Sequence, residues 1–140
     1  MFITRLQTEW FTLAVDDGEH MLRLRRSAKK LRSVQELELA MSRLFEALEQ
    51  IVPTSERPRW SFLQDMRQAP LLDNPEWEAI QLRHVDRFRF GWRRQALLVQ
   101  TAIGKLQARR INGQASVLAA GAIEIFDDEI AALSYLRQSA

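Results

Sequence analysis

The 140-residue chain contains no cysteine, which excludes disulfide bonds, thiolate metal sites and cysteine nucleophiles. Its two histidines, His20 and His84, have no neighbour at a metal-ligand spacing such as His-x-x-x-His, so we expect no metal site. No apolar run approaches the roughly 18–20 residues of a membrane-spanning helix. Residues 1–5 lack the basic and apolar regions of a signal peptide. These absences predict a cytoplasmic protein with no membrane span and no cofactor.

Composition and charge are typical of an ordinary globular domain. Hydrophobic residues make up 46% of the chain, and 5 glycines and 4 prolines are too few for a collagen-like or low-complexity sequence. This length suits a single domain over residues 1–140. The 20 basic and 18 acidic residues leave a net charge of +2. The arginine-rich segments 23–32 and 83–94 carry no recognisable nucleic-acid motif, so we expect no nucleic-acid partner; arginines among aromatic residues are equally typical of protein interfaces.

The N-terminal part of the sequence predicts a β-hairpin. Residues 10–15 are rich in strand-forming side chains. Residues 21–26 alternate leucine with arginine, which is the period of a strand with one buried face. Asp17-Gly18 lies between the two runs and is a frequent hairpin turn.

The middle of the chain gives the clearest helix signal. Ser33 and Glu36 have the spacing of a capping box. Apolar residues then recur at helical spacing as far as residue 52. Residues 59–66 predict a strand, and residues 75–90 predict a second helix.

The last third of the sequence alternates between strands and helices. The expected elements are a buried strand over residues 95–100, a helix over 102–111 that stops at Asn112-Gly113, a strand over 121–126 and a terminal helix capped by Asp127, with Ile130, Leu133, Tyr135 and Leu136 on its core side. The element order is therefore ββαβαβαβα. Strands joined through helices pair in parallel. We predict an α/β domain whose mostly parallel central sheet has about five strands, an antiparallel N-terminal hairpin and four helices.

Catalytic motifs are missing or incomplete, so we expect no enzyme. The chain has neither Gly-x-Ser-x-Gly nor Gly-x-Gly-x-x-Gly. The segment with Thr101, Gly104 and Lys105 follows a buried strand and opens a helix, where free backbone N–H groups favour an anion. Leu106 follows Lys105, so the segment is not a Walker loop. Together with Arg109, it is a candidate site for a small molecule, a lipid or an anion.

The segment from Asp65 to Asp73 resembles the Asp-x-Ser-x-x-x-x-x-Asp-Ser segment of the STAS family, especially its SpoIIAA-like branch of the anti-sigma factor antagonist type. The hairpin, the strand ending in Asp65 and the later strand-helix-strand-helix order resemble that fold over nearly the whole chain. The resemblance implies a non-enzymatic regulatory module that docks a protein partner, such as an anti-sigma factor or a sensor-kinase-like protein.

The resemblance also implies where a partner docks and how docking is switched. The implied docking residues are Asp65, Arg67, Asp73, Asn74 and Trp77. In the family, a phosphorylated serine follows the second aspartate. This chain has Asn74 and Pro75 there, so we expect phosphorylation at this place to be lost. A second copy of the chain is another candidate partner, because Trp10, Trp77 and Trp92 are more large aromatic side chains than we expect so small a domain to enclose.

Overall fold

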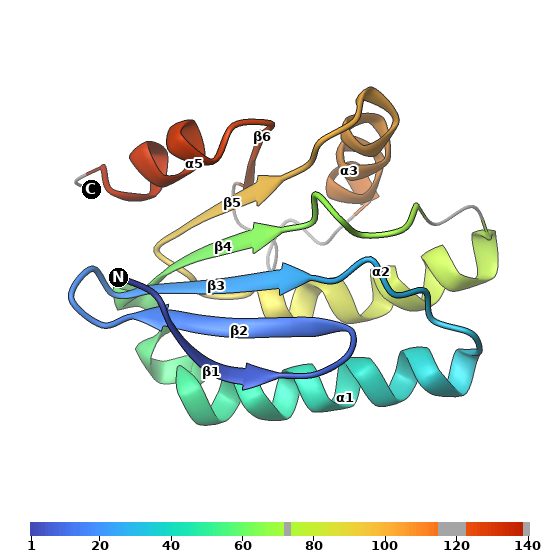
Figure 1. Cartoon of the computed structure of the whole chain (residues 1–140), viewed down its shortest axis with the longest axis horizontal. Helices are drawn as coiled ribbons and strands as arrows, with labels where there is room; N and C mark the ends of the chain where they lie inside the picture. The colour runs from blue at the N-terminus through green and yellow to red at the C-terminus, as the bar shows by residue number, and fades with distance from the viewer. Residues whose placement is uncertain (72–73, 115–122, 139–140) are drawn as a thin grey trace.

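The computed structural model describes residues 1–71, 74–114 and 123–138, which form one six-stranded sheet flanked by helices (Figure 1). The strands are β1 (Ile3–Gln7), β2 (Phe11–Asp16), β3 (Met21–Arg26), β4 (Ser61–Asp65), β5 (Arg94–Leu98) and β6 (Ile123–Phe126). The helices are α1 (Val34–Ile51), the 3-10 helix η1 (Thr54–Arg59), α2 (Pro75–Arg89), α3 (Ala102–Gln114) and α5 (Glu129–Leu136). The predicted α/β architecture is confirmed.

The six strands lie in the sheet in the same order as in the sequence. β1, β2 and β3 pair antiparallel, whereas β3 to β6 pair in parallel. The predicted hairpin is β2 and β3, with Asp16 opposite Met21 at its turn. The prediction of about five strands missed the edge strand β1. Four of its five residues are exposed, so Ile3–Gln7 lacks the apolar alternation by which a half-buried strand is recognised.

The connections of the parallel strands place the helices. The chain steps from β3 to β4, β5 and β6 in one direction along the sheet. Such crossovers are almost always right-handed, so α1, α2 and α3, which make them, fall on the same face. α5 follows the last strand and packs on the opposite face, against β4, β5 and β6 (Figure 1).

Strand alternation divides the core between these two faces. On β4, Phe62 packs into the larger cluster, between the sheet and helices α1 and α2. The next residue, Leu63, packs with Ala132 and Leu136 of α5. Phe62 also contacts Trp92, with the two rings tilted by 30° and 4.6 Å between their centroids. Each side of the central strand therefore has its own apolar layer.

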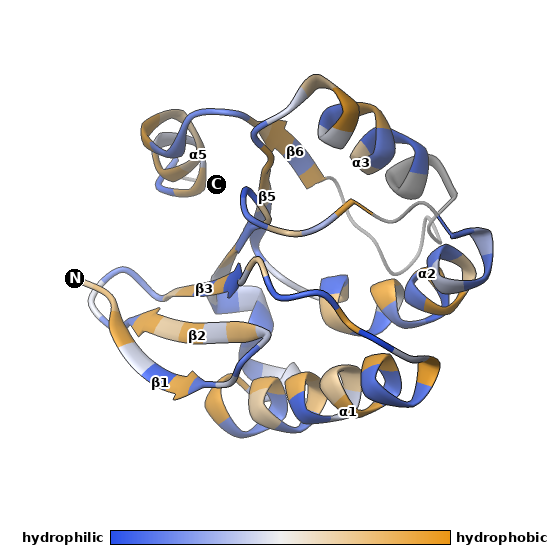
Figure 2. Cartoon of the chain, turned by 45° about the vertical axis from the view of Figure 1, so that its right-hand side comes forward, coloured by the Kyte–Doolittle hydropathy of each residue, from blue (hydrophilic) through white to orange (hydrophobic). Residues whose placement is uncertain are grey.

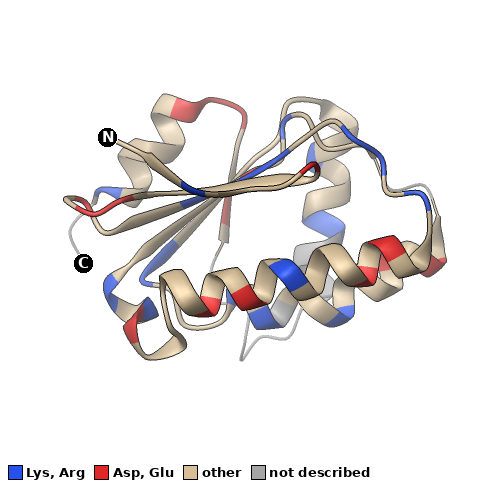
Figure 3. Cartoon of the chain, turned by 60° about the horizontal axis from the view of Figure 1, so that its bottom comes forward, with Lys and Arg blue, Asp and Glu red and all other residues tan. Residues whose placement is uncertain are grey.

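Helix α1 follows the predicted pattern closely. The Ser33 side chain accepts a hydrogen bond from the Glu36 backbone N–H at 3.1 Å, which is the first half of the predicted capping box. The Glu36 carboxylate accepts from the Arg32 N–H, one residue earlier than expected. The buried positions of the helix are Leu37, Ala40, Leu44, Ala47 and Leu48. Its apolar bands are visible in Figure 2, and the colours of Figure 3 mark the acidic and basic residues along it.

Two expectations about the C-terminal helix are wrong. Its N-cap is Asp128, whose side chain accepts a hydrogen bond from the Ala131 N–H at 3.2 Å. Asp127 instead forms an ion pair with Lys105 of α3. Ile130 is 78% exposed rather than in the core, because it lies on the side of α5 that faces away from the sheet.

One further expectation fails, and another is met only in part. α3 continues through Asn112-Gly113 to Gln114, since one glycine inside a helix costs only about 1 kcal/mol. Trp10 and Trp92 are buried, with 4% and 8% exposure, and only Trp77 remains half-buried. The domain therefore encloses two of the three tryptophans that suggested self-association.

We predict that Leu48→Ala lowers the free energy of unfolding by about 2–5 kcal/mol, because it removes a fully buried side chain from the α1 side of the core. Urea unfolding measures the change. Leu39→Ala, in the same helix but at a position 53% exposed, is the control and should stay within about 0.5 kcal/mol of the parent chain. Equal losses for the two variants would contradict the packing described above.

Candidate functional site

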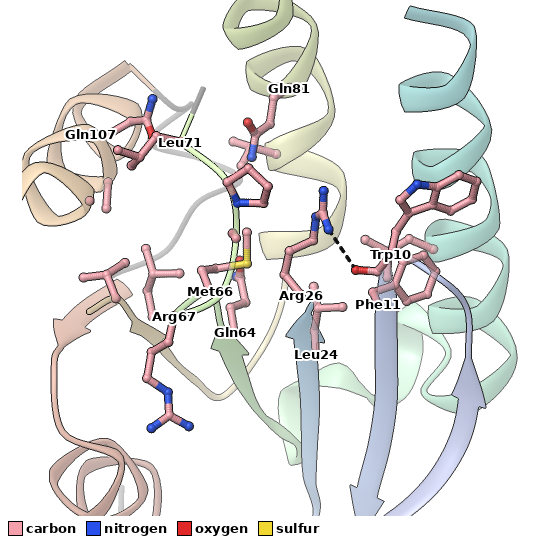
Figure 4. A pocket seen from close by; sticks show the side chains of 18 of the residues that line it. Trp10, Phe11, Leu24, Arg26, Gln64, Met66, Arg67, Leu71, Gln81 and Gln107 are labelled. Carbon is pink, nitrogen blue, oxygen red and sulfur yellow. Dashed lines mark hydrogen bonds between the residues drawn. The ribbon is translucent and has the colours of Figure 1, made fainter. Parts of the chain in front are cut away.

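A cavity of about 230 Å³ lies at the carboxyl ends of β3, β4 and β5. Helices α1, α2 and α3 and the chain after β4 enclose it (Figure 4). Each of the three strands leaves the sheet there for a different helix, which opens a space between the helices. In open α/β sheets, ligands bind outside the carboxyl ends of the strands.

The floor of the cavity is apolar except at one position. In the sheet register, Leu24 of β3, Gln64 of β4 and Leu97 of β5 lie side by side. All three line the cavity. Further apolar lining comes from Leu37, Ala40, Met41, Leu44, Val85, Phe88, Val99 and Ala108.

Gln64 is the polar group of this floor. The residue is 3% exposed, and its Nε2 is buried without a hydrogen-bond partner. The buried Trp10 Nε1 and Gln81 Oε1, from two other lining residues, also have no partner. A buried polar atom that is left unpaired costs about 1–3 kcal/mol. Three such atoms belong to residues that line this cavity.

Arg26 brings a positive charge to the same space. It lies at the end of β3, next to β4, and Figure 4 shows its side chain rising beside Gln64 toward α2. Its Nη1 donates hydrogen bonds to the carbonyl oxygens of Trp10 (3.1 Å) and Ser27 (2.8 Å). Burial lowers the pKa of the Arg26 guanidinium, although an arginine this basic stays charged at neutral pH. No carboxylate in the described part of the chain forms an ion pair with Arg26.

The predicted docking residues Asp65 and Arg67 form a closed ion-pair network on the α5 side of the sheet. Arg67 donates to Asp65 through Nε (2.9 Å) and Nη2 (2.8 Å), and Arg25 adds a hydrogen bond at 3.0 Å. Arg67 Nη2 also reaches Glu129 of α5 at 3.2 Å. Burial alone raises the pKa of the Asp65 carboxyl, but the hydrogen bonds from Arg67 and Arg25 outweigh it and hold that pKa below its ordinary value.

The other predicted docking residues are not gathered into one site. Asn74 is the N-cap of α2 and accepts a hydrogen bond from the Glu76 N–H at 2.9 Å. Trp77 is half-buried, and Asp73 lies outside the described residues. The structure thus gives Asp65 and Asn74 structural partners, and docking by these residues stays a prediction.

The predicted anion site at the start of α3 is only partly beside the cavity. Thr101 and Gly104 line it, whereas Lys105 is paired with Asp127, and Arg109 is exposed. The Thr101 hydroxyl accepts the Gly104 N–H at 2.9 Å and so caps the helix itself. A Cβ at Gly104 would lie 3.0 Å from that hydroxyl, so glycine permits the close approach.

A second, more open hollow of about 560 Å³ lies between α1 and α2. Its polar side chains largely bind one another or the backbone. His84 Nε2 lies 3.2 Å from a Glu38 oxygen, Glu49 accepts hydrogen bonds from Thr54, and Arg57 donates to two carbonyl oxygens. Among the described residues, this hollow therefore has fewer buried, unpaired polar groups for binding a ligand than the cavity over Gln64.

Neither a metal centre nor a membrane span is found in the described ranges. No group of three or more histidine, aspartate or glutamate side chains there could hold a metal ion. Nor is any helix in those ranges long and apolar enough to cross a bilayer.

Sequence reasoning did not single out Gln64 and Arg26, which are the candidate residues of this cavity. The predicted strand over residues 59–66 contained the signal for Gln64, because it shares a face with Phe62 in a strand flanked on both sides. In the sequence, Arg26 stands out only as one member of the arginine-rich segment 23–32. Nothing local marks the cavity itself, since its walls come from residues that are far apart in the chain.

Comparison with known proteins gives no relative. No family model, no curated protein and no solved structure matches the chain. The observed mixed sheet is consistent with a STAS-like topology, and the likeness goes no further than the fold.

We predict that Asp65→Asn lowers the free energy of unfolding by about 1–3 kcal/mol at pH 7, because it removes the buried carboxylate that pairs with the partly exposed Arg67 and Arg25. The folded-state pKa of Asp65 is lowered, so its stabilisation is complete above the unfolded pKa of about 3.9 and is lost as the pH falls through the folded value. The gap between variant and parent should therefore shrink below about pH 4. Urea unfolding across that range measures it.

The control for this prediction is Asp17→Asn, which changes an exposed carboxylate in the turn between β2 and β3. It should alter the free energy of unfolding by less than about 0.5 kcal/mol at every pH. A difference between Asp65→Asn and the parent chain that stays constant with pH would rule out the ion-pair account.

Proposed function

We propose that this chain is a non-enzymatic binding domain whose cavity over Gln64 holds a small molecule with an apolar body and a polar end. One observation carries the proposal: the Gln64 carboxamide, 3% exposed and without a hydrogen-bond partner at Nε2, lies between Leu24 and Leu97 in the floor of a mostly apolar cavity. Ligand sites in proteins share this character of mostly apolar walls with a few placed polar groups.

The size of the cavity limits the ligand. A cavity of about 150 Å³ accommodates a benzene molecule, and this one has about 230 Å³. By that scaling, the enclosed part of the ligand has roughly ten non-hydrogen atoms. An eight-carbon alcohol or acid is therefore a suitable probe.

We predict that octan-1-ol or octanoate stabilises the protein and that Ala108→Leu abolishes this effect. Ala108 lines the cavity and is 7% exposed, so a larger side chain there occupies the space the ligand needs. At 100 times the dissociation constant, a ligand adds about 2.7 kcal/mol to the free energy of unfolding. Thermal unfolding with and without each probe measures it.

The matched control is Ala131→Leu, the same change at an exposed position of α5. It should respond to both probes as the parent chain does. If neither probe stabilises the parent chain, or if Ala108→Leu responds as strongly as the parent, the proposed binding function is wrong.

A second candidate function, in which the chain acts as a STAS-like docking module in the cytoplasm, draws support from the outer side of α3. Ile103 and Leu106 are both 64% exposed, and residues three apart lie on the same side of a helix. Two exposed apolar side chains on one helix face are typical of a contact surface. The orange bands on α3 in Figure 2 show this apolar character.

We expect a photo-crosslinking residue at position 106 to capture one discrete protein partner, or a second copy of the chain, in cells that express it. The same residue at position 43, an exposed arginine on α1, is the control. Identical products from the two positions would count against docking on α3.

A further inference from the structure

The chemical character of the ligand's polar end can be read from Arg26. Leu24 and Gln64 are partners in the register of β3 and β4. Arg26 lies two residues further along β3 and on the same face as Leu24, so its Cα is roughly 8 Å from that of Gln64 by strand geometry. Their side chains therefore reach one end of the cavity together (Figure 4).

The guanidinium of Arg26 keeps its best carboxylate-binding edge free. All of its protein hydrogen bonds in the described chain come from Nη1, to Trp10 and Ser27. The Nε–H and Nη2–H pair, which matches the two oxygens of a carboxylate, has no protein acceptor there. The same pair of Arg67 is occupied by Asp65, at 2.9 and 2.8 Å. Arg26 at the end of β3 therefore has this edge open, whereas Arg67, which follows β4, has it filled by a carboxylate of the chain.

The charge of the cavity wall also favours an anion. The described lining contains three arginines, Arg26, Arg67 and Arg89, and no aspartate or glutamate. Arg67 turns away toward α5, where Asp65 and Glu129 neutralise it (Figure 4). Arg26 therefore has no counter-ion within the described lining, and a buried or half-buried cation is costly without one.

We propose that the ligand is a small monocarboxylate whose two oxygens pair with Nε and Nη2 of Arg26, at the end of the cavity where the Gln64 carboxamide also lies. Its apolar body lies over Leu24 and Leu97, against the walls from α1, α2 and α3. This inference rests on the proposed binding function and adds the class of ligand. A phosphate monoester is a poorer fit, because its three acceptor oxygens need more donors than this end of the cavity presents.

Three probes with one tail and different heads test the proposal: octanoate, octan-1-ol and octylamine, each titrated calorimetrically into the parent chain. Octanoate should bind at least tenfold more tightly than octan-1-ol, and octylamine should bind more weakly than octan-1-ol. Arg26→Gln should weaken octanoate at least tenfold and change octan-1-ol less than twofold. Arg43→Gln, an equal loss of charge on the exposed side of α1, should change neither.

Arg26 also anchors the Trp10 carbonyl, so Arg26→Gln must first be shown to unfold cooperatively. If it does not fold, Arg26→Lys decides the question. That variant keeps the charge but not the paired N–H groups, so octanoate should still bind more tightly than octan-1-ol, by a smaller factor than in the parent. An equal loss of both probes in Arg26→Lys would overturn the assignment.

The results separate this inference from the proposed function. If octan-1-ol binds as tightly as octanoate, or if Arg26→Gln weakens both equally while Ala108→Leu abolishes both, the cavity binds ligands and the carboxylate assignment is wrong. If no probe binds, or binding survives Ala108→Leu, both proposals fail.

Discussion

The position of β4 between two parallel strands is the constraint on which the rest of the structure depends. Every residue of Ser61–Asp65 is buried, and consecutive side chains point to opposite faces. The two polar residues at its end, Gln64 and Asp65, are therefore sent into different layers. The Asp65 side chain lies in the layer between the sheet and α5, where it pairs with Arg25 and Arg67. Gln64 enters the layer of α1 and α2 and finds no partner in the described chain.

The handedness of the crossovers explains why a cavity forms over Gln64 and not over Asp65. Three helices must share the face that holds Gln64, and each begins after a strand that ends at the same edge. The space left between them is lined mainly by the N-terminal halves of α1 and α3 and by the C-terminal half of α2. On the opposite face, α5 packs against β4, β5 and β6. There Arg67 forms ion pairs with both Asp65 of β4 and Glu129 of α5, which links the end of the strand to the helix.

The sequence predicts helices, strands and caps well where neighbouring residues determine them. It predicts them poorly where contacts with residues distant in the chain determine them. The capping serine of α1, the Asp-Gly turn and the apolar run of β5 each have a local physical cause, and each was confirmed. β1 was missed because an exposed edge strand does not need apolar alternation. The cap of α5 was placed one residue early, since two adjacent aspartates compete and Lys105, distant in sequence, takes the first.

The candidate site shows the same division. The spacing of Asp65 and Asp73 predicted a docking face that includes Arg67, but the Asp65 carboxylate and the Arg67 guanidinium satisfy each other. A carboxylate and a guanidinium that bind each other have few hydrogen-bonding groups left for a ligand. In contrast, the unpaired edge of Arg26 and the buried, unpaired Gln64 Nε2 lower the stability of the folded chain, and no contact within its described part compensates for that. A leucine at position 64 would complete the apolar row of Leu24 and Leu97 at no such cost. The polar residue there makes sense physically if a bound molecule regularly supplies the missing acceptor.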